Sequence, residues 1–239
     1  MTILKSQPVT PSNEQPSTEN KGLPIERSII HRPNDLLIVG FVLILVGYFL
    51  PWFKLQAAGL TLIGLDISEW LKFMPQFASG ELPNRNFFYL PPIGLGAMLV
   101  LWSVINDGDV RRGWIVAAAG CLIALIAFPA LEALPINGEK FRNFSEWRFR
   151  IVLIGLVFVL AVGRPLLVRL PVKVLVGLMG VIALIAAILP ARLLYLSRSA
   201  YIFWLRLTPN PGLGFGLHLL GTLFILWAVW LLLKRSLSS

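Results

Sequence analysis

The chain has 239 residues, of which 56% are hydrophobic and only 14% are charged, with a mean hydropathy of +0.77. Soluble domains carry about 25% charged residues, so this composition excludes an ordinary soluble protein and predicts an integral membrane protein. The net charge is +9, but the basic residues lie at the ends of apolar runs, where we expect anionic lipid headgroups and not nucleic acid as their partners.

The predicted fold is an all-α, polytopic membrane helix bundle of about six transmembrane helices. Residues 1–34 are polar and contain no apolar segment of the kind found in a cleavable signal peptide, so we expect a disordered N-terminal tail. Residues 35–235 form the predicted transmembrane domain, and 236–239 a short C-terminal tail. The predicted spans cover residues 36–53, 90–105, 114–131, 145–163, 174–189 and 213–233.

The last predicted span is the clearest, because it contains no charged residue. The fourth is the weakest, because Arg148 and Arg150 fall inside it and each arginine at the bilayer centre costs about 3 kcal/mol. We expect both arginines to reach the headgroup level by extending their side chains. Trp52, at the end of the first span, is expected in the aromatic belt at the membrane surface.

A short amphipathic helix is predicted between Asp66 and Pro75. Its apolar face comprises residues at helical spacing, Ile67, Trp70, Leu71 and Met74. Asp66 and Glu69 have the spacing of a capping box, with the aspartate as N-cap, and the proline ends the helix.

Features of this region recur along the chain. Leu50-Pro51 is echoed by Phe128-Pro129 and Leu189-Pro190, and the segment 66–70 is echoed by 143–147. The segment 70–75 is echoed by 204–209. These matches predict three tandem hairpins, each with a short interfacial helix, although an apolar chain rich in tryptophan and proline also produces such matches by chance.

The orientation depends on the basic residues. Their numbers are nearly equal on the two sides, but they are denser in the short links and C-terminal tail. This density predicts both termini on the cytoplasmic side, and we expect the bacterial cytoplasmic membrane as the location.

No catalytic constellation is visible. The middles of the apolar runs contain no Asp, Glu, Lys or Arg, and the chain lacks the common phosphate-binding, metalloprotease and hydrolase motifs. The single cysteine, Cys121, is expected to be a small packing residue. We therefore predict a protein that is not an enzyme and carries neither a metal nor a required cofactor.

His218 is the one polar candidate inside a predicted span. It follows several glycines, so it could be an axial ligand of a haem or a chlorophyll-type ring. The alternative is a histidine that is hydrogen-bonded to a neighbouring helix.

The remaining candidates are expected to contact lipid or a partner protein at the membrane surface. The pairs Glu69/Trp70 and Glu146/Trp147 could bind a cation together, or could serve as helix caps and belt residues. The basic residues are expected to contact lipid phosphates, with a specific anionic ligand as the alternative. The full set of candidate contact residues is Trp52, Glu69, Trp70, Lys72, Glu146, Trp147, Arg148, Arg150, Trp204 and Arg206, together with the basic residues Arg142 and Arg198.

Three functions are consistent with these features. The first is a non-enzymatic accessory or scaffold subunit that docks on partner subunits of a larger membrane complex. The second is a transport component, such as a solute-binding or permease subunit, and the third is a haem or pigment carrier that uses His218. Small-residue pairs such as Gly120/Ala124, Ala183/Ala187 and Gly212/Gly216 are expected at helix contacts.

Overall fold

The structure is a computed structural model that describes residues 33–54, 61–106, 108–129, 144–205 and 210–237. All of these residues belong to one structural unit, Arg32–Ser239. The predicted disordered tail lies outside the described residues, apart from Pro33 and Asn34, the first two residues of the first helix.

The described chain is mainly helical, as predicted. The long helices are α1 (Pro33–Phe49), α4 (Leu90–Ile105), α5 (Val110–Ala124), α6 (Phe144–Val162), α8 (Val172–Leu205) and α9 (Leu213–Leu237). The short helices are α2 (Gly64–Leu71), α3 (Pro75–Ala78) and α7 (Arg164–Leu167), with 3-10 turns η2 (Arg85–Tyr89) and η3 (Leu125–Ala127). Three two-residue strands, which we did not predict, are β1 (Phe53–Lys54), β2 (Thr61–Leu62) and β3 (Asn210–Pro211).

Four helical segments are long and apolar enough to cross a membrane. They are Arg85–Ile105, Val110–Ala127, Val172–Ile202 and Leu213–Ser236. α1 is apolar but has only 17 residues, or about 25 Å at 1.5 Å per residue. These helices support a membrane protein.

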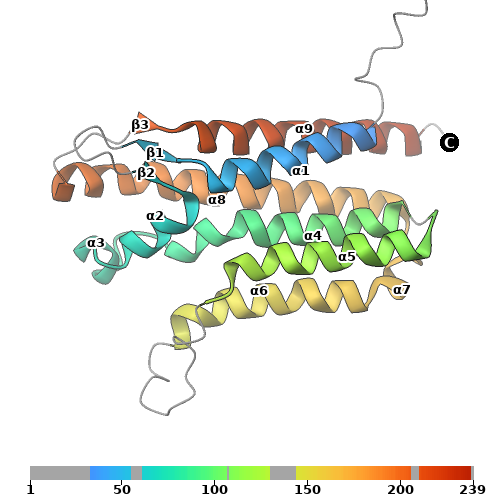
Figure 1. Cartoon of the computed structure of the whole chain (residues 1–239), viewed down its shortest axis with the longest axis horizontal. Coiled ribbons are helices and arrows are strands. Elements are labelled where there is room, and N and C mark those ends of the chain that lie inside the picture. The colour runs from blue at the N-terminus through green and yellow to red at the C-terminus, as the bar shows by residue number, and fades with distance from the viewer. Residues whose placement is uncertain (1–32, 55–60, 107, 130–143, 206–209, 238–239) are drawn as a thin grey trace, which may run out of the picture. The chain divides into compact units, whose positions relative to one another are not determined.

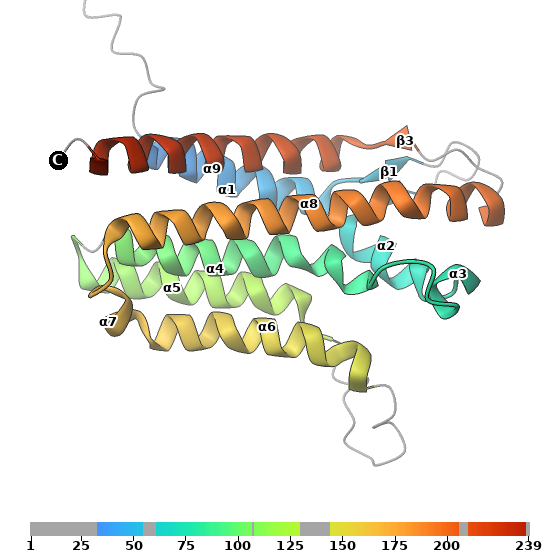
Figure 2. The same ribbon diagram turned by 180° about the vertical axis from the view of Figure 1, so that it is seen from behind.

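The long helices run side by side (Figures 1 and 2). In both views α1 and α9 lie along one edge of the bundle and α6 along the other, with α4, α5 and α8 between them. α1 packs mainly on α9, and α4 packs on both α5 and α8. The first helix therefore packs mainly on the last. The predicted series of tandem hairpins did not include this contact.

Glycines allow the closest helix contacts. A Cβ atom on Gly40 would lie 2.8 Å from the Gly221 carbonyl oxygen, and one on Gly221 would lie 2.7 Å from that of Gly40. Gly96 of α4 and Gly120 of α5 have the same reciprocal relation. In lipid the hydrophobic effect does not drive helices together. Small residues such as these let the backbones approach closely, so that van der Waals contacts stabilise the helix pair. The prediction for Gly120 was correct, whereas Gly216 is exposed and a Cβ atom added there would have no atom within 4 Å.

One end of the bundle carries a platform, which we define as the three strands, α2, α3 and the last turns of α8. The strands form an antiparallel sheet in the order β2-β1-β3, with Phe53 opposite both Leu62 and Pro211. Tyr201 of α8 packs against Phe53, with 5.3 Å between the ring centroids. The sheet and α2 lie together at this end of the helices (Figure 1).

The predicted end of the fifth span at residue 189 is wrong, because α8 is longer. The helix continues through Pro190 to Leu205, so residues 199–205 belong to it and do not form a separate interfacial helix. Its 34 residues extend for about 50 Å, which exceeds the roughly 30 Å hydrocarbon core. Its last turns therefore reach the platform.

The second predicted interfacial helix is also absent as a separate element, because α6 is continuous from Phe144 to Val162. Among the described residues of the three recurring segments, those of the first form a separate short helix, α2, whereas 144–147 belong to α6 and 204–205 to α8. α2 begins two residues earlier than predicted, at Gly64. Asp66 is thus the third helical residue, and its carboxylate accepts a hydrogen bond from the Ile63 N–H at 3.3 Å.

Candidate functional site

A polar cluster lies where α2, η2 and α6 meet. Glu69 Oε1 accepts hydrogen bonds from the Tyr89 hydroxyl at 2.5 Å and from Arg85 Nη1 at 3.3 Å, while Oε2 pairs with Lys72 Nζ at 3.0 Å. Glu69 does not reach back to the start of α2, so the predicted capping box is wrong. One carboxylate instead ties α2 to the segment that leads into α4.

Arg85 fixes this junction through its backbone as well. Its side chain is 2% exposed, and Nη1 also donates to the Ser68 carbonyl oxygen at 3.3 Å. In return the Ser68 hydroxyl donates to the Arg85 carbonyl oxygen at 3.1 Å. Buried guanidinium groups require such hydrogen bonds, because desolvation of an unpaired charge is costly.

Arg150 joins the cluster from α6. Its guanidinium carbon lies 3.8 Å from the centre of the Tyr89 ring, which is a close cation–π contact. We expected Arg150 to extend to the headgroups, but it is only 1% exposed. The neighbouring Arg148 is exposed. The two arginines therefore differ: one is part of the protein interior and the other is accessible.

The electrostatics of Glu69 follow from these contacts. Partial burial by itself raises the pKa of the carboxyl. Hydrogen bonds from Tyr89 and Lys72, together with the charges of Arg85 and Lys72, outweigh this effect and hold the pKa below its usual value of 4.5. Glu69 is therefore ionised at neutral pH and acts as a structural anion.

Trp52 is the centre of a second junction. It was expected at the membrane surface, but it is fully buried, and its Nε1 donates to the Gly47 carbonyl oxygen at 2.9 Å. Its ring lies against Phe88, Phe215 and His218, with centroid distances of 6.0, 5.5 and 5.2 Å. Burial is possible because the single polar atom of the indole finds a backbone partner inside the protein.

His218 is hydrogen-bonded to a neighbouring helix and is not placed to bind a haem-type ring. Its Nε2 lies 3.3 Å from the carbonyl oxygen of Ala186 on α8. Because a carbonyl oxygen only accepts, Nε2 carries the hydrogen. Ala186 is four residues before Pro190, whose missing N–H leaves this carbonyl without its helical partner. His218 therefore supplies the hydrogen bond that the proline removes. The imidazole is fully buried with Trp52 beside it, and this geometry does not favour a macrocyclic ligand.

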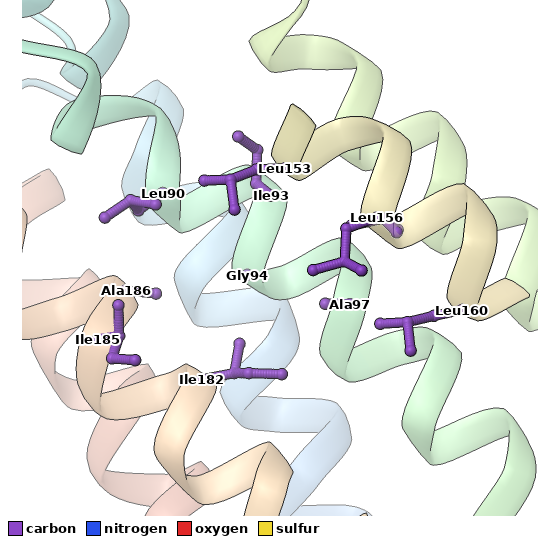
Figure 3. Close-up of a pocket in the computed structure, with 11 residues that line it drawn as sticks. Leu90, Ile93, Gly94, Ala97, Leu153, Leu156, Leu160, Ile182, Ile185 and Ala186 are labelled. Atoms are coloured by element: carbon purple, nitrogen blue, oxygen red, sulfur yellow. The ribbon is translucent and has the colours of Figure 1, made fainter. Parts of the chain in front are cut away.

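An apolar groove lies between α6 and α8, above α4 (Figure 3). Its cavity volume is about 170 Å³. Leu156 and Ile185 on its walls are 52% and 46% exposed, so the groove opens sideways. All of its lining residues are apolar: Leu90, Ile93, Gly94, Ala97, Leu153, Leu156, Val157, Leu160, Ile182, Ile185 and Ala186.

The other predicted contact residues are only partly described. Trp70, which was predicted on the apolar face of its helix, is 42% exposed, whereas Glu69 is bound to Tyr89, Arg85 and Lys72. Lys72 and Arg198 are exposed. The side chains of Glu146, Trp147 and Trp204 lie outside the described part of the structure, as do the whole of Arg142 and Arg206. The proposed joint site of the two Glu/Trp pairs therefore stays a prediction.

Sequence reasoning missed Arg85, Tyr89 and the link between His218 and Pro190. Arg85 and Tyr89 lie just before the second predicted span, in a segment whose sequence indicates only a polar turn followed by aromatic residues. The link between His218 and Pro190 could have been predicted, because a proline in one apolar run leaves a carbonyl without a donor and a lone histidine in another run can supply one. Among the described residues there is no cluster of His, Cys, Asp or Glu that could hold a metal ion.

Comparison of the chain with models of protein families, with curated proteins and with solved structures finds no match.

Proposed function

We propose that the chain is a non-enzymatic accessory or scaffold subunit of a larger membrane complex, which docks on its partner through the outer face of α2. The observation that carries this proposal is that α2 buries one apolar face in the protein and exposes aromatic side chains on the other. Its inner face, Ile67 and Leu71, is fully buried, while Trp70 and Phe73 just beyond its end are 42% and 73% exposed.

The rigidity of α2 supports a docking role. Glu69 and Ser68 hold the helix to Arg85 and Tyr89 through the hydrogen bonds described above, so the exposed aromatic pair is presented in a fixed position. Fixed aromatic side chains lose little conformational entropy on binding and are enriched among residues that dominate interface energies. Lys72, which lies 4.9 Å above the Phe73 ring, adds a positive charge and favours an acidic rim on the partner.

The membrane topology is part of the proposal. We place all six long helices in the bilayer, with α1 and α6 added to the four longest apolar segments, and with both termini in the cytoplasm. The platform then lies on the outer side. A cysteine placed at Ser239 in a Cys121→Ala background tests this, because an impermeant maleimide should label it only after the cells are lysed.

The docking role is tested by purifying the tagged chain from its native membrane in mild detergent. We expect stoichiometric partner proteins with the wild type and their loss from the Trp70→Ala/Phe73→Ala double variant. Trp230→Ala on α9 is the matched control, because Trp230 is also exposed, at 56%, but lies far along α9 from the platform. Recovery of the wild type as a lone monomer would contradict the proposal.

The transport alternative needs a path for a solute. Within the described residues, the groove between α6 and α8 has only apolar lining, and this does not favour a polar solute. The carrier alternative depends on His218, whose Nε2 already binds Ala186. We therefore put the scaffold function first.

A further inference from the structure

We infer that the groove between α6 and α8 holds one acyl chain of an anionic phospholipid, with the headgroup at the Arg148 end. This binding site is separate from the proposed docking face of α2. Its argument rests on the lining of the groove, its size and the charges at its end.

The lining excludes a polar occupant. Every residue that lines the groove is apolar, and Leu156 and Ile185 are half exposed on its two walls, so an occupant enters from the lipid side. Figure 3 shows Leu156 and Leu160 of α6 across from Ile182 and Ile185 of α8, with Gly94 and Ala97 of α4 between the walls. An acyl chain satisfies such a surface without any hydrogen bond.

The size favours a thin chain over a partner helix. The cavity volume is about 170 Å³, whereas a helix with its side chains is about 10–12 Å across. Along α4 the lining extends from Leu90 to Ala97, which is about 10 Å at 1.5 Å per residue. A narrow space of this length fits part of a hydrocarbon chain.

The charges identify the headgroup. Leu153, at one end of the groove, is three residues after Arg150 and therefore lies on the same face of α6. Leu90, at the same end, directly follows Tyr89, on which Arg150 stacks. Arg148, two residues before Arg150 on α6, is exposed at the same end of the helix.

The balance of charge at this end is positive. Among the described side chains of α2, η2 and α6, with Lys72 just beyond α2, two are negative, Asp66 and Glu69, and four are positive, Lys72, Arg85, Arg148 and Arg150. Basic groups at the membrane surface attract anionic headgroups. An acyl chain in the groove places a phosphate at the same end as these arginines.

The groove is tested by filling it. Ile185→Trp places a large side chain in the groove, and Leu184→Trp is the matched control, because Leu184 is the next residue on α8, is 42% exposed and does not line the groove. Leu156→Trp fills the groove from the other wall and serves if Ile185→Trp does not fold. The probes are phosphatidylglycerol and phosphatidylcholine with identical chains, added to the detergent-purified protein, and glycerol 3-phosphate.

We expect native mass spectrometry to show one phosphatidylglycerol retained by the wild type and by Leu184→Trp, and about tenfold less by Ile185→Trp and Leu156→Trp. The same lipid should raise the melting temperature of the first two proteins only. Arg148→Gln should reduce the preference for phosphatidylglycerol over phosphatidylcholine, whereas Arg169→Gln, at an exposed arginine beyond the opposite end of α6, should not. Glycerol 3-phosphate should have no effect.

Equal retention by Ile185→Trp and Leu184→Trp would overturn the site. Equal retention of the two lipids by the wild type would overturn the headgroup assignment, as would a thermal shift with glycerol 3-phosphate alone. Loss of a protein partner from the groove variants, without loss of lipid, would show that a protein is the occupant. None of these readouts depends on Trp70 or Phe73, so failure here is distinguishable from failure of the docking role.

Discussion

The dipeptides Leu50-Pro51 and Leu189-Pro190 look alike in the sequence, but their structures are opposite. α1 ends at Phe49, and the chain turns into β1 after the first proline. α8 continues for fifteen residues beyond the second proline. The carbonyl group four residues before each proline accepts a side-chain hydrogen bond, at Gly47 from Trp52 Nε1 and at Ala186 from His218 Nε2. The comparison teaches that neither the proline nor the carbonyl that it leaves unpaired decides by itself whether a helix ends, and that the tertiary neighbours of the following chain decide it.

Each proline has a different neighbour. At Pro51, the backbone of α9 approaches closely, and the Gly214 N–H donates to the Pro51 carbonyl oxygen at 2.9 Å. At Pro190, the His218 side chain supplies the donor that the Ala186 carbonyl lacks. Both neighbours belong to the first turns of α9, so one helix stabilises the chain end at one proline and the continuous helix at the other.

The largest expected effect is at Gly214. A Cβ atom there would overlap the Leu50 carbonyl oxygen and lie 2.6 Å from that of Gly47. Because backbone atoms cannot move away cheaply, we expect Gly214→Ala to lower the free energy of unfolding by about 3 kcal/mol. Gly216→Ala is the control, since a Cβ atom added there would meet nothing within 4 Å. Equal stability of the two variants in a detergent melting experiment would argue against close packing at Pro51.

Next is the hydrogen bond at Pro190. His218→Phe removes the donor and leaves the Ala186 carbonyl buried without a partner, so we expect a loss of about 1–3 kcal/mol of stability. Pro190→Ala restores the helical N–H. In that background the cost of His218→Phe should fall markedly, which a double-mutant cycle of melting curves measures. The same cost in both backgrounds would show that His218 does not act through the proline.

The smallest expected effect is the pH dependence of stability that Glu69 contributes. Glu69 anchors α2, which lies in the segment that follows Pro51. Its lowered pKa means that the carboxylate contributes stability above the unfolded-state value of 4.5, and that this contribution is lost as the pH falls through the lower folded value. The stability difference between wild type and Glu69→Gln should therefore be constant near neutral pH and shrink below about pH 4.5. A difference that grows on acidification would contradict the ion pairs of Glu69 with Lys72 and Arg85. Partial exposure keeps the effect small.

Much of the helical framework was predictable from local pattern. α4 has the predicted bounds Leu90–Ile105, because two prolines at its start and a polar turn at its end delimit the apolar run. α6 was placed to within one residue at each end. α5 begins four residues earlier than predicted, because Asp109 caps it by accepting hydrogen bonds from the N–H groups of Arg111 and Arg112.

The site was less predictable, because its members are distant in the sequence. Glu69 and Arg150 were both singled out, but as surface residues. Only the fold brings them to Tyr89, whose hydroxyl donates to the half-buried Glu69 and whose ring lies against the buried Arg150. Trp52 was assigned to the membrane surface for the same reason: its partner Gly47 lies one turn back, but the rings that cover it come from η2 and α9.

The sequence by itself determined that this is a helical membrane protein, where α4 and α6 begin and end, and that α2 has an apolar face. These properties depend on composition and on periodicity within a few turns of chain, which act locally. Only the tertiary structure decided that Pro190 lies inside a helix, that Arg150 is buried and that a groove remains between α6 and α8. Each of these depends on what a second or third helix places opposite a residue, and the energy of a buried polar group or of an unfilled space is set by those neighbours.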